Sequence, residues 1–186
     1  MTEWKSFLIN NMNNINKSPR NKKHFSKLVN FASKIIKLCK KAKITPILYG
    51  SAAHFIHTQD TSVKINDIDL WIREKEYPQL IKELKNNKIN YEYVPKWHTL
   101  IIKIGKLRVE IDSIDFWYRD LKNKPLPRNF DNFSFNGRKI KIIDLKGLEN
   151  LYLIAYQKTK DNKKKIIDKI KHLEKFLERK LKAKFA

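Results

Sequence analysis

Two short stretches of this 186-residue chain decide its fold, Leu48-Tyr49-Gly50-Ser51 and, after a spacer, Asp67-Ile68-Asp69-Leu70-Trp71. Side chains two residues apart on a strand point to the same face, so Asp67 and Asp69 should lie side by side while their apolar neighbours enter the core. Two adjacent carboxylates repel each other unless a cation lies between them, which favours a divalent metal ion. Gly50 lets backbone N–H groups approach phosphate oxygens, and the N-terminus of the helix expected after it favours anions. The pattern therefore predicts a site for a nucleotide and a metal ion.

Gly50, Ser51, Asp67 and Asp69 fill the four defining positions of a known signature, and this region resembles the nucleotidyltransferase superfamily. That signature is an apolar residue, Gly, Gly or Ser, a spacer, and then Asp-apolar-Asp or Asp-apolar-Glu. The spacer here, residues 52–66, is slightly longer than the common form. The competing interpretation is a surface strand with two solvated aspartates after an ordinary glycine turn.

The resemblance calls for a third carboxylate on a later strand. Residues 100–104 and 107–112 are predicted to form a hairpin that turns at Gly105-Lys106. On its second strand, Glu110 and Asp112 share the polar face, and either could reach the metal ions. We favour Asp112, because aspartate is the usual residue in the relatives that the chain resembles, and Glu110 stays open as the alternative.

The resemblance also implies the chemistry, which is transfer of a nucleoside monophosphate from an NTP to an acceptor with release of pyrophosphate. Asp67, Asp69 and Asp112 are then the catalytic and metal-binding residues, and they hold two Mg²⁺ ions. Gly50 and Ser51 are the nucleotide-binding residues and hold the β and γ phosphates through backbone N–H groups and the serine hydroxyl.

The net charge of +22 points to a polyanionic acceptor. Most of the excess lies in residues 1–44 and 158–186, so the predicted core is close to balanced. We expect RNA, in particular tRNA, as the acceptor and partner. Three alternatives stay open: a protein hydroxyl, as in toxin–antitoxin nucleotidyltransferases, a small molecule, or a module that binds nucleic acid without catalysis. The lysine excess is also open to a simpler explanation, an A-rich genome.

The C-terminal part resembles the branch of the superfamily that includes abortive-infection toxins. That branch often carries a lysine on one helix and an Arg/Lys-Asp-x-x-Asp run on the next. Here the run reads Lys164-Lys165-Ile166-Ile167-Asp168, and one aspartate is missing. We therefore interpret Lys158, Lys164 and Asp168 as a solvated helix face. Lys169 on the same helix is expected to serve polyanion binding, away from the nucleotide.

The predicted fold class is α+β, a nucleotidyltransferase-like mixed sheet with helices packed on one side and flanking N- and C-terminal helices. The chain divides into a basic arm and helix (1–43), a nucleotidyltransferase core (44–124) and a C-terminal hairpin and helical extension (125–186). Helical periodicity predicts helices over residues 24–42, 51–57, 77–86, 145–156 and 163–182. Strands are predicted over residues 44–49, 67–73, 89–94, 100–104, 107–112, 133–135 and 139–143.

Other sequence features bear on the location of the protein and on the roles of its histidine and aromatic residues. The sequence lacks a run of 18 apolar residues and a signal peptide, so we expect a cytoplasmic protein without a membrane partner. The oligomeric state stays open. His54 and His57 are expected at polar surface positions, with a nucleotide contact as the alternative. Four aromatic residues near strand ends are open to two interpretations, base stacking or sheet packing: Trp71, Trp97, Trp117 and Tyr118.

Overall fold

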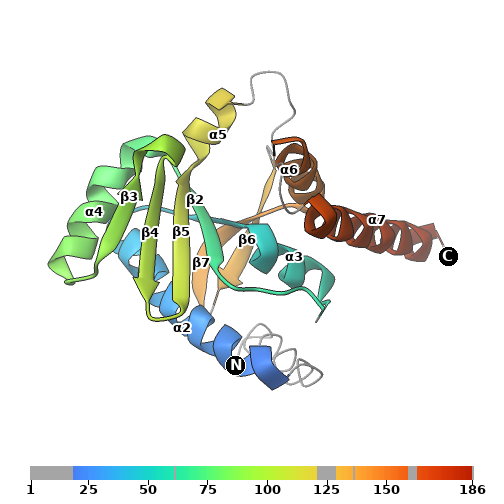
Figure 1. Ribbon diagram of the computed structural model, residues 1–186, viewed down its shortest axis with the longest axis horizontal. Coiled ribbons are helices and arrows are strands. Elements are labelled where there is room, and N and C mark those ends of the chain that lie inside the picture. Colours follow the sequence, from blue (N-terminus) through green and yellow to red (C-terminus); the bar gives the residue numbers. More distant parts are fainter. Residues whose placement is uncertain (1–18, 61, 121–128, 136, 159–162, 186) are drawn as a thin grey trace.

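A seven-stranded mixed sheet forms the centre of the computed structural model, which describes residues 19–60, 62–120, 129–135, 137–158 and 163–185 (Figure 1). The strand order is β3-β4-β5-β2-β1-β7-β6. The strands are β1 (Ile47–Tyr49), β2 (Ile68–Ile72), β3 (Tyr91–Val94), β4 (Thr99–Ile104), β5 (Leu107–Ser113), β6 (Phe130–Phe135) and β7 (Arg138–Ile143). The helices are α2 (Pro19–Lys41), α3 (Gly50–Thr58), α4 (Tyr77–Asn86), α5 (Ile114–Asp120), α6 (Leu145–Lys158) and α7 (Lys163–Phe185), with 3-10 turns η2 (Glu74–Glu76) and η3 (Pro95–Trp97).

Both predicted hairpins belong to this one sheet. β4 and β5 pair antiparallel around Gly105, and β5 then lies parallel to β2. β6 and β7 also pair antiparallel, and β7 lies parallel to β1. The hairpin that the sequence places in a C-terminal extension is thus joined directly to the strand before Gly50. Asn136 of its turn lies outside the described residues.

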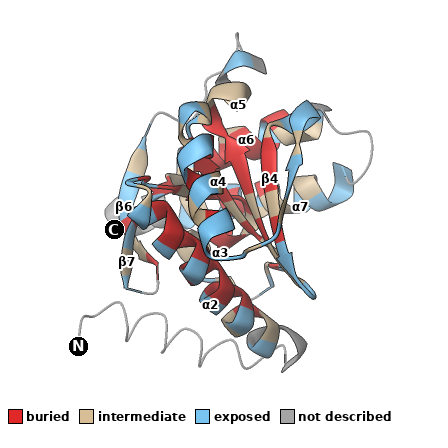
Figure 2. Ribbon diagram, turned by 90° about the vertical axis from the view of Figure 1, so that its left-hand side faces the viewer, coloured by how far each residue is buried: buried red, intermediate tan, exposed pale blue. Residues whose placement is uncertain are grey.

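Helices α2 and α4 pack together, and α2 lies across β2, β5 and β7 (Figure 1). The apolar residues of α2 recur at helical spacing, which creates one continuous apolar face. That face is buried, from Phe25 through Leu28, Ile35 and Ile36 to Cys39. In Figure 2 the buried residues form a band along the side of α2 that meets the sheet, while its other side is exposed. The lysines of α2 from Lys23 to Lys41 are exposed and therefore lie on a solvated face.

Helices α3, α6 and α7 gather at the other end of the molecule, at the right of the sheet in Figure 1. α3 packs on β1, β2 and α6, and α7 packs along α6. The ring of Phe55 on α3 also meets Phe25 of α2 edge-on, at 5.5 Å between centroids. The docking of α7 against α3 brings Lys169 close to the Gly50–Ser51 turn.

The predicted α+β mixed sheet is confirmed, and most element boundaries agree within three residues. Helix α5 was not predicted, because the sequence after β5 shows only a turn signal at Asp115. The structure shows why a helix starts after β5. Ser113 is fully buried, and its hydroxyl accepts a hydrogen bond of 3.0 Å from the backbone N–H of Phe116, which caps the new helix. Among the described helices, none is long and apolar enough to cross a membrane.

Candidate active site

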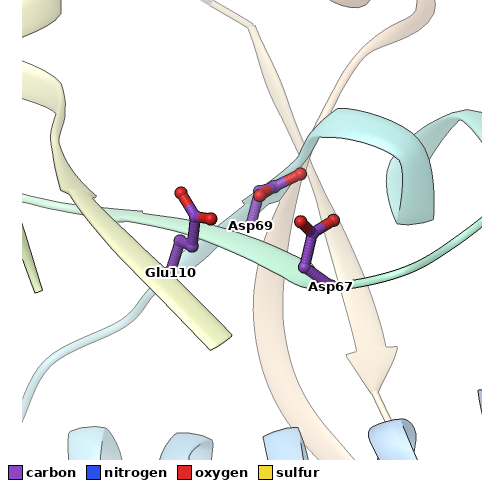
Figure 3. A group of neighbouring side chains, drawn as sticks. All are labelled: Asp67, Asp69 and Glu110. Atoms are coloured by element: carbon purple, nitrogen blue, oxygen red, sulfur yellow. The ribbon is translucent and has the colours of Figure 1, made fainter. Parts of the chain in front are cut away.

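Three carboxylates from two neighbouring strands converge on one side of the sheet. β2 and β5 pair in parallel with Asp69 opposite Glu110, and Asp67 lies just before β2. One oxygen from each carboxylate lies within 4.8 Å of one oxygen from each of the others. Figure 3 shows the three carboxyl groups pointing to the same side, away from the blue helix α2. The structure therefore brings Asp67 and Asp69 together, as the alternation predicts, and adds Glu110.

The electrostatics of this cluster favour a cation. Burial raises the pKa of Asp69 well above its usual value, and the negative charges of Asp67, Glu110 and Asp112 raise it further. Burial also raises the pKa of Glu110, against the opposing influence of Arg108. Burial and the neighbouring negative charges thus disfavour the ionised forms of Asp69 and Glu110 until a positive charge enters. Three half-buried carboxylates with oxygens this close together suit a hard divalent ion such as Mg²⁺, which binds few protein carboxylates and keeps further positions for other oxygen ligands.

Asp112 lies outside the cluster, two residues after Glu110 on β5. It pairs with Trp71 in the β2–β5 register and is 7% exposed. Both its oxygens already accept hydrogen bonds, Oδ1 from the Thr99 hydroxyl at 2.5 Å and Oδ2 from the Tyr49 hydroxyl. The sequence favoured Asp112 as the third ligand, but the geometry favours Glu110, the alternative it left open. The alternation of side chains places Glu110 and Asp112 on the same face of β5. It does not reveal the register of β5 against β2, which decides which of the two lies opposite Asp69.

The turn at Gly50 is built so that only glycine fits. Its φ is +69°, a left-handed conformation that L side chains rarely adopt, and a Cβ there would lie 2.0 Å from Oδ2 of Asp69. The carboxylate of Asp69 therefore lies directly against the turn that opens α3. Ser51 lies inside α3, because the helix begins at Gly50, and the cap position, Tyr49, makes no side-chain hydrogen bond.

The hydroxyl of Ser51 instead meets Lys169 of α7, whose Nζ donates to Ser51 Oγ at 2.8 Å. The same Nζ lies 5.0 Å from the centre of the Tyr152 ring, and the Tyr152 hydroxyl donates to the carbonyl oxygen of Gly50 at 3.2 Å. Burial lowers the pKa of Lys169, as does Lys165, while Asp69 opposes this shift. A half-buried ammonium group thus lies against the Gly-Ser turn, close enough to Asp69 and Asp67 for their charges to interact.

Sequence reasoning expected Lys169 to lie away from the predicted nucleotide-binding residues, but its Nζ contacts Ser51, so the structure adds Lys169 to the candidate site. It lies far along the chain from Ser51, in a lysine-rich helix whose composition suggests only a solvated face. Lys164 and Asp168 are exposed, as expected, but together with Lys169 they line a cavity of about 430 Å³. The side chain of Lys158 lies outside the described residues.

The prediction that His54 occupies a polar surface position is wrong. His54 is fully buried, because α7 packs over α3 and stacks the ring of His172 on it, with Nε2 of His54 3.0 Å from Nδ1 of His172. His172 in turn lies 2.9 Å from the carboxylate of Asp60 through Nε2. Burial, together with the charges of His172 and Lys169, lowers the pKa of His54 to about 4. His57 is half-buried, with Nε2 2.7 Å from the carbonyl oxygen of Ile143.

The aromatic residues separate into two groups. Trp71 is 1% exposed and stacks on Tyr49, so sheet packing explains it. Trp97 is 58% exposed and lines a cavity beside Glu110 together with half-buried Trp117. The side chain of Tyr118 lies outside the described residues.

Comparison with known proteins identifies the fold. No protein-family model and no curated protein matches the sequence. Among solved structures, the antibiotic-resistance factor ANT(2'')-Ia is similar with a TM-score of 0.61 and 14% identity over 82% of this chain and 85% of that one. The lincosamide antibiotic adenylyltransferase LnuA, in its lincomycin-bound structure, has a TM-score of 0.52 and 17% identity over 78% of this chain and 95% of that one.

A third similar structure is the polyadenylate synthase of Megavirus, with a TM-score of 0.54 and 10% identity over 93% of this chain and 35% of that one. This chain therefore spans about a third of that synthase and most of ANT(2'')-Ia and LnuA. The shared architecture defines the class: the chain has the nucleotidyltransferase fold.

Proposed function

We propose that the protein is a Mg²⁺-dependent nucleotidyltransferase that transfers a nucleoside monophosphate from an NTP to an acceptor hydroxyl and releases pyrophosphate. The observation that carries this proposal is the convergence of Asp67, Asp69 and Glu110 beside the Gly50–Ser51 turn. The proposal is supported by the nucleotidyltransferase fold. The chain shares this fold with ANT(2'')-Ia, solved in complex with adenylyl-2''-tobramycin, with the lincosamide antibiotic adenylyltransferase LnuA and with a polyadenylate synthase.

The positions of the three carboxylates suggest different roles in holding the metal ions. Asp69 lies against the Gly-Ser turn and, together with Asp67, would hold a metal ion on the triphosphate side, while Glu110 lines the cavity at Trp97 and would hold a metal ion on the acceptor side. Bound Mg²⁺ supplies charge neutralisation and alignment of the attacking and leaving oxygens. Asp112, earlier favoured for this role, holds the Tyr49 hydroxyl and so fixes the aromatic stack beneath the site.

Lys169 and Ser51 bind the β and γ phosphates in this proposal. The Lys169 ammonium already lies within hydrogen-bond distance of Ser51, and both groups can donate to phosphate oxygens that approach the turn. The cavity beyond them is lined by Lys64, Lys164 and Lys165, all exposed, so its cations favour the departing pyrophosphate. The N-terminus of α3, at Gly50, adds backbone N–H groups to the same anion site.

RNA, with tRNA as the expected form, remains our proposed acceptor. The charge of +22 and the solvated lysines of α2 support a partner with a phosphate backbone. The second candidate is a small molecule, favoured by one observation: the chain covers most of the length of two proteins of this fold that act on or bind antibiotics.

A labelling experiment tests both the reaction and the acceptor. The protein is incubated with each α-labelled NTP, Mg²⁺ and total cellular RNA or total protein, before and after RNase treatment. We expect label in RNase-sensitive material, and no label for Asp67→Asn or Asp69→Asn. Asp131→Asn is the matched control, because Asp131 is an exposed strand aspartate away from the cluster.

The outcomes separate the hypotheses. Label in protein would assign a protein acceptor of the toxin–antitoxin kind. Label in neither RNA nor protein, with NTP consumption that requires a small hydroxyl compound, would assign a small-molecule acceptor. Full turnover in Asp67→Asn or Asp69→Asn would show that the proposed metal site is not the active site.

A further inference from the structure

A cavity of about 250 Å³ opens beside Glu110, on the opposite side of the acid cluster from Lys169. Its walls are apolar and aromatic, formed by Val94, Trp97, Ile101, Phe116 and Trp117. Thr99, Arg108, Glu110 and Asp112 supply the polar groups. We call this space the Trp97 cavity. An apolar pocket with a few polar groups next to a metal-binding carboxylate is suited to an organic ring that carries a reacting hydroxyl.

Trp97 is the unusual member of this cavity because the fold does not bury it. It lies in η3, between β3 and β4, and 58% of its surface is exposed. The ammonium group of Lys96 lies 5.1 Å from the centre of its ring. Trp71, by contrast, is covered by Tyr49. A large exposed indole at the mouth of a cavity is a stacking surface for another flat ring.

Cations continue from the cavity along the same face of the sheet. Lys103 and Arg108 are partners in the β4–β5 register, and Arg108 forms an ion pair with Glu110 two residues farther along β5. Both positive charges lie close enough to lower the pKa of Glu110. Glu92 on β3, opposite Ile101, is an acidic neighbour on this side. Together with Lys96, these cations favour a ligand that carries phosphates next to its ring.

We propose that the Trp97 cavity binds the terminal nucleotide of a single-stranded oligonucleotide acceptor. The terminal base stacks on Trp97, the preceding phosphates lie along Lys96, Lys103 and Arg108, and the terminal ribose hydroxyl faces Glu110. This inference rests on the proposed function and names the chemical class of its acceptor. The terminal hydroxyl oxygen bonds to the α-phosphorus of the NTP, the bond from that phosphorus to the bridging oxygen breaks, pyrophosphate leaves with the electron pair, and the hydroxyl proton passes to solvent.

The test measures binding without turnover. A single-stranded RNA oligonucleotide with 2-aminopurine at its 3′ end is titrated with the full-length protein in Mg²⁺ without NTP. We expect its fluorescence to be quenched on binding. Trp97→Ala should abolish the quenching and weaken binding about five- to hundredfold, the effect of losing one base–aromatic stack, while Trp97→Phe keeps most of both. Tyr93→Ala is the control, because Tyr93 is also exposed but packs edge-on against Tyr77 on the other face of β3.

Binding of Mg²⁺·ATP, measured by calorimetry on the same samples, separates this inference from the function on which it rests. If ATP binds and the oligonucleotide does not, or binds equally well to Trp97→Ala, the inference is overturned and the nucleotidyltransferase proposal stands. If the folded protein neither binds Mg²⁺·ATP nor transfers label, the proposed function fails with it. A blunt duplex that ends in the same base should show no dependence on Trp97, and equal dependence would also overturn the stacking role.

Discussion

Replacement of Gly50 by alanine tests the close contact between the Gly-Ser turn and the acid cluster. The structure predicts two separate penalties. The first is backbone strain, because φ is +69° and an L side chain in the left-handed region costs roughly 1–2 kcal/mol. The second is the clash of the new Cβ with Oδ2 of Asp69, only 2.0 Å away, which forces the Asp69 side chain off its rotamer at about 0.5–1.5 kcal/mol.

The sum predicts that Gly50→Ala lowers the free energy of unfolding by about 1.5–3.5 kcal/mol. Gly105→Ala is a matched control, because Gly105 also has a positive φ, +56°, but no atom lies within 4 Å of its added Cβ. It should cost only the strain, about 1–2 kcal/mol. Urea denaturation of both variants measures the difference. Nucleotidyl transfer should fall about a hundredfold or more in Gly50→Ala alone, since a displacement of about 1 Å at a reacting centre costs this much.

A double-mutant cycle isolates the contact itself. In an Asp69→Ala background the clashing carboxylate is absent and only the contact with Cβ of residue 69, at 3.1 Å, is left, so Gly50→Ala should cost little more than Gly105→Ala does. The reasoning is refuted if Gly50→Ala destabilises wild type and the Asp69→Ala background equally, or if it leaves transfer activity intact. Either result would mean that the position of the Asp69 carboxylate does not require a glycine at residue 50.

Lys169→Met should raise KM for Mg²⁺·NTP about ten- to hundredfold, since a charged hydrogen bond contributes roughly 1.5–3 kcal/mol. Lys171 is exposed on the same helix, so the control Lys171→Met should leave KM unchanged. Equal KM values for the two variants would contradict the phosphate-binding role. Glu110→Gln should reduce turnover at least about ten- to hundredfold, the loss that follows even from removing an outer-shell partner of a metal ligand, with little change in stability. Asp112→Asn should mainly lower the unfolding free energy, by about 1–2 kcal/mol, because Asp112 accepts hydrogen bonds from two hydroxyl groups. Single-turnover rates and urea denaturation decide between them, and a larger loss of turnover in Asp112→Asn would reverse the assignment. His54 has a folded-state pKa of about 4 against 6.5 when unfolded, so the unfolded state takes up the proton first, and stability should fall by up to about 3 kcal/mol as pH drops from 6.5 to 4. His54→Gln should remove that part of the pH dependence in thermal denaturation curves, and a variant whose curve still parallels wild type would show that His54 does not titrate as inferred.

Local sequence chemistry was sufficient for much of the architecture. The helical spacing of apolar residues predicts α2 and α4, and the alternation around Asp67 and Asp69 places both carboxylates on one face, as observed. These features depend on residues close together in the chain, where periodicity reports directly on burial. Helix α5 escaped prediction because its start depends on the buried hydroxyl of Ser113, which no local pattern reveals.

The buried histidine and the exposed tryptophan show where local reasoning ends. His54 reads as a polar position on its own helix, yet α7 covers it and stacks His172 on its ring. Trp97 and Trp71 look alike in sequence, but only Trp71 receives a covering ring. Burial of a side chain is decided by whatever element packs above it, and that element can come from anywhere in the chain.

By itself, then, the sequence determined the Gly-Ser turn, the paired aspartates and the sheet that carries them, since each rests on spacing within one or two elements. The tertiary structure alone decided which carboxylate completes the cluster and which lysine joins it. The parallel register of β2 with β5 puts Glu110 rather than Asp112 beside Asp69, and the docking of α7 brings Lys169 to Ser51. Strand register and helix docking are set by packing between distant segments, and packing of that kind leaves no trace in the spacing of neighbouring residues.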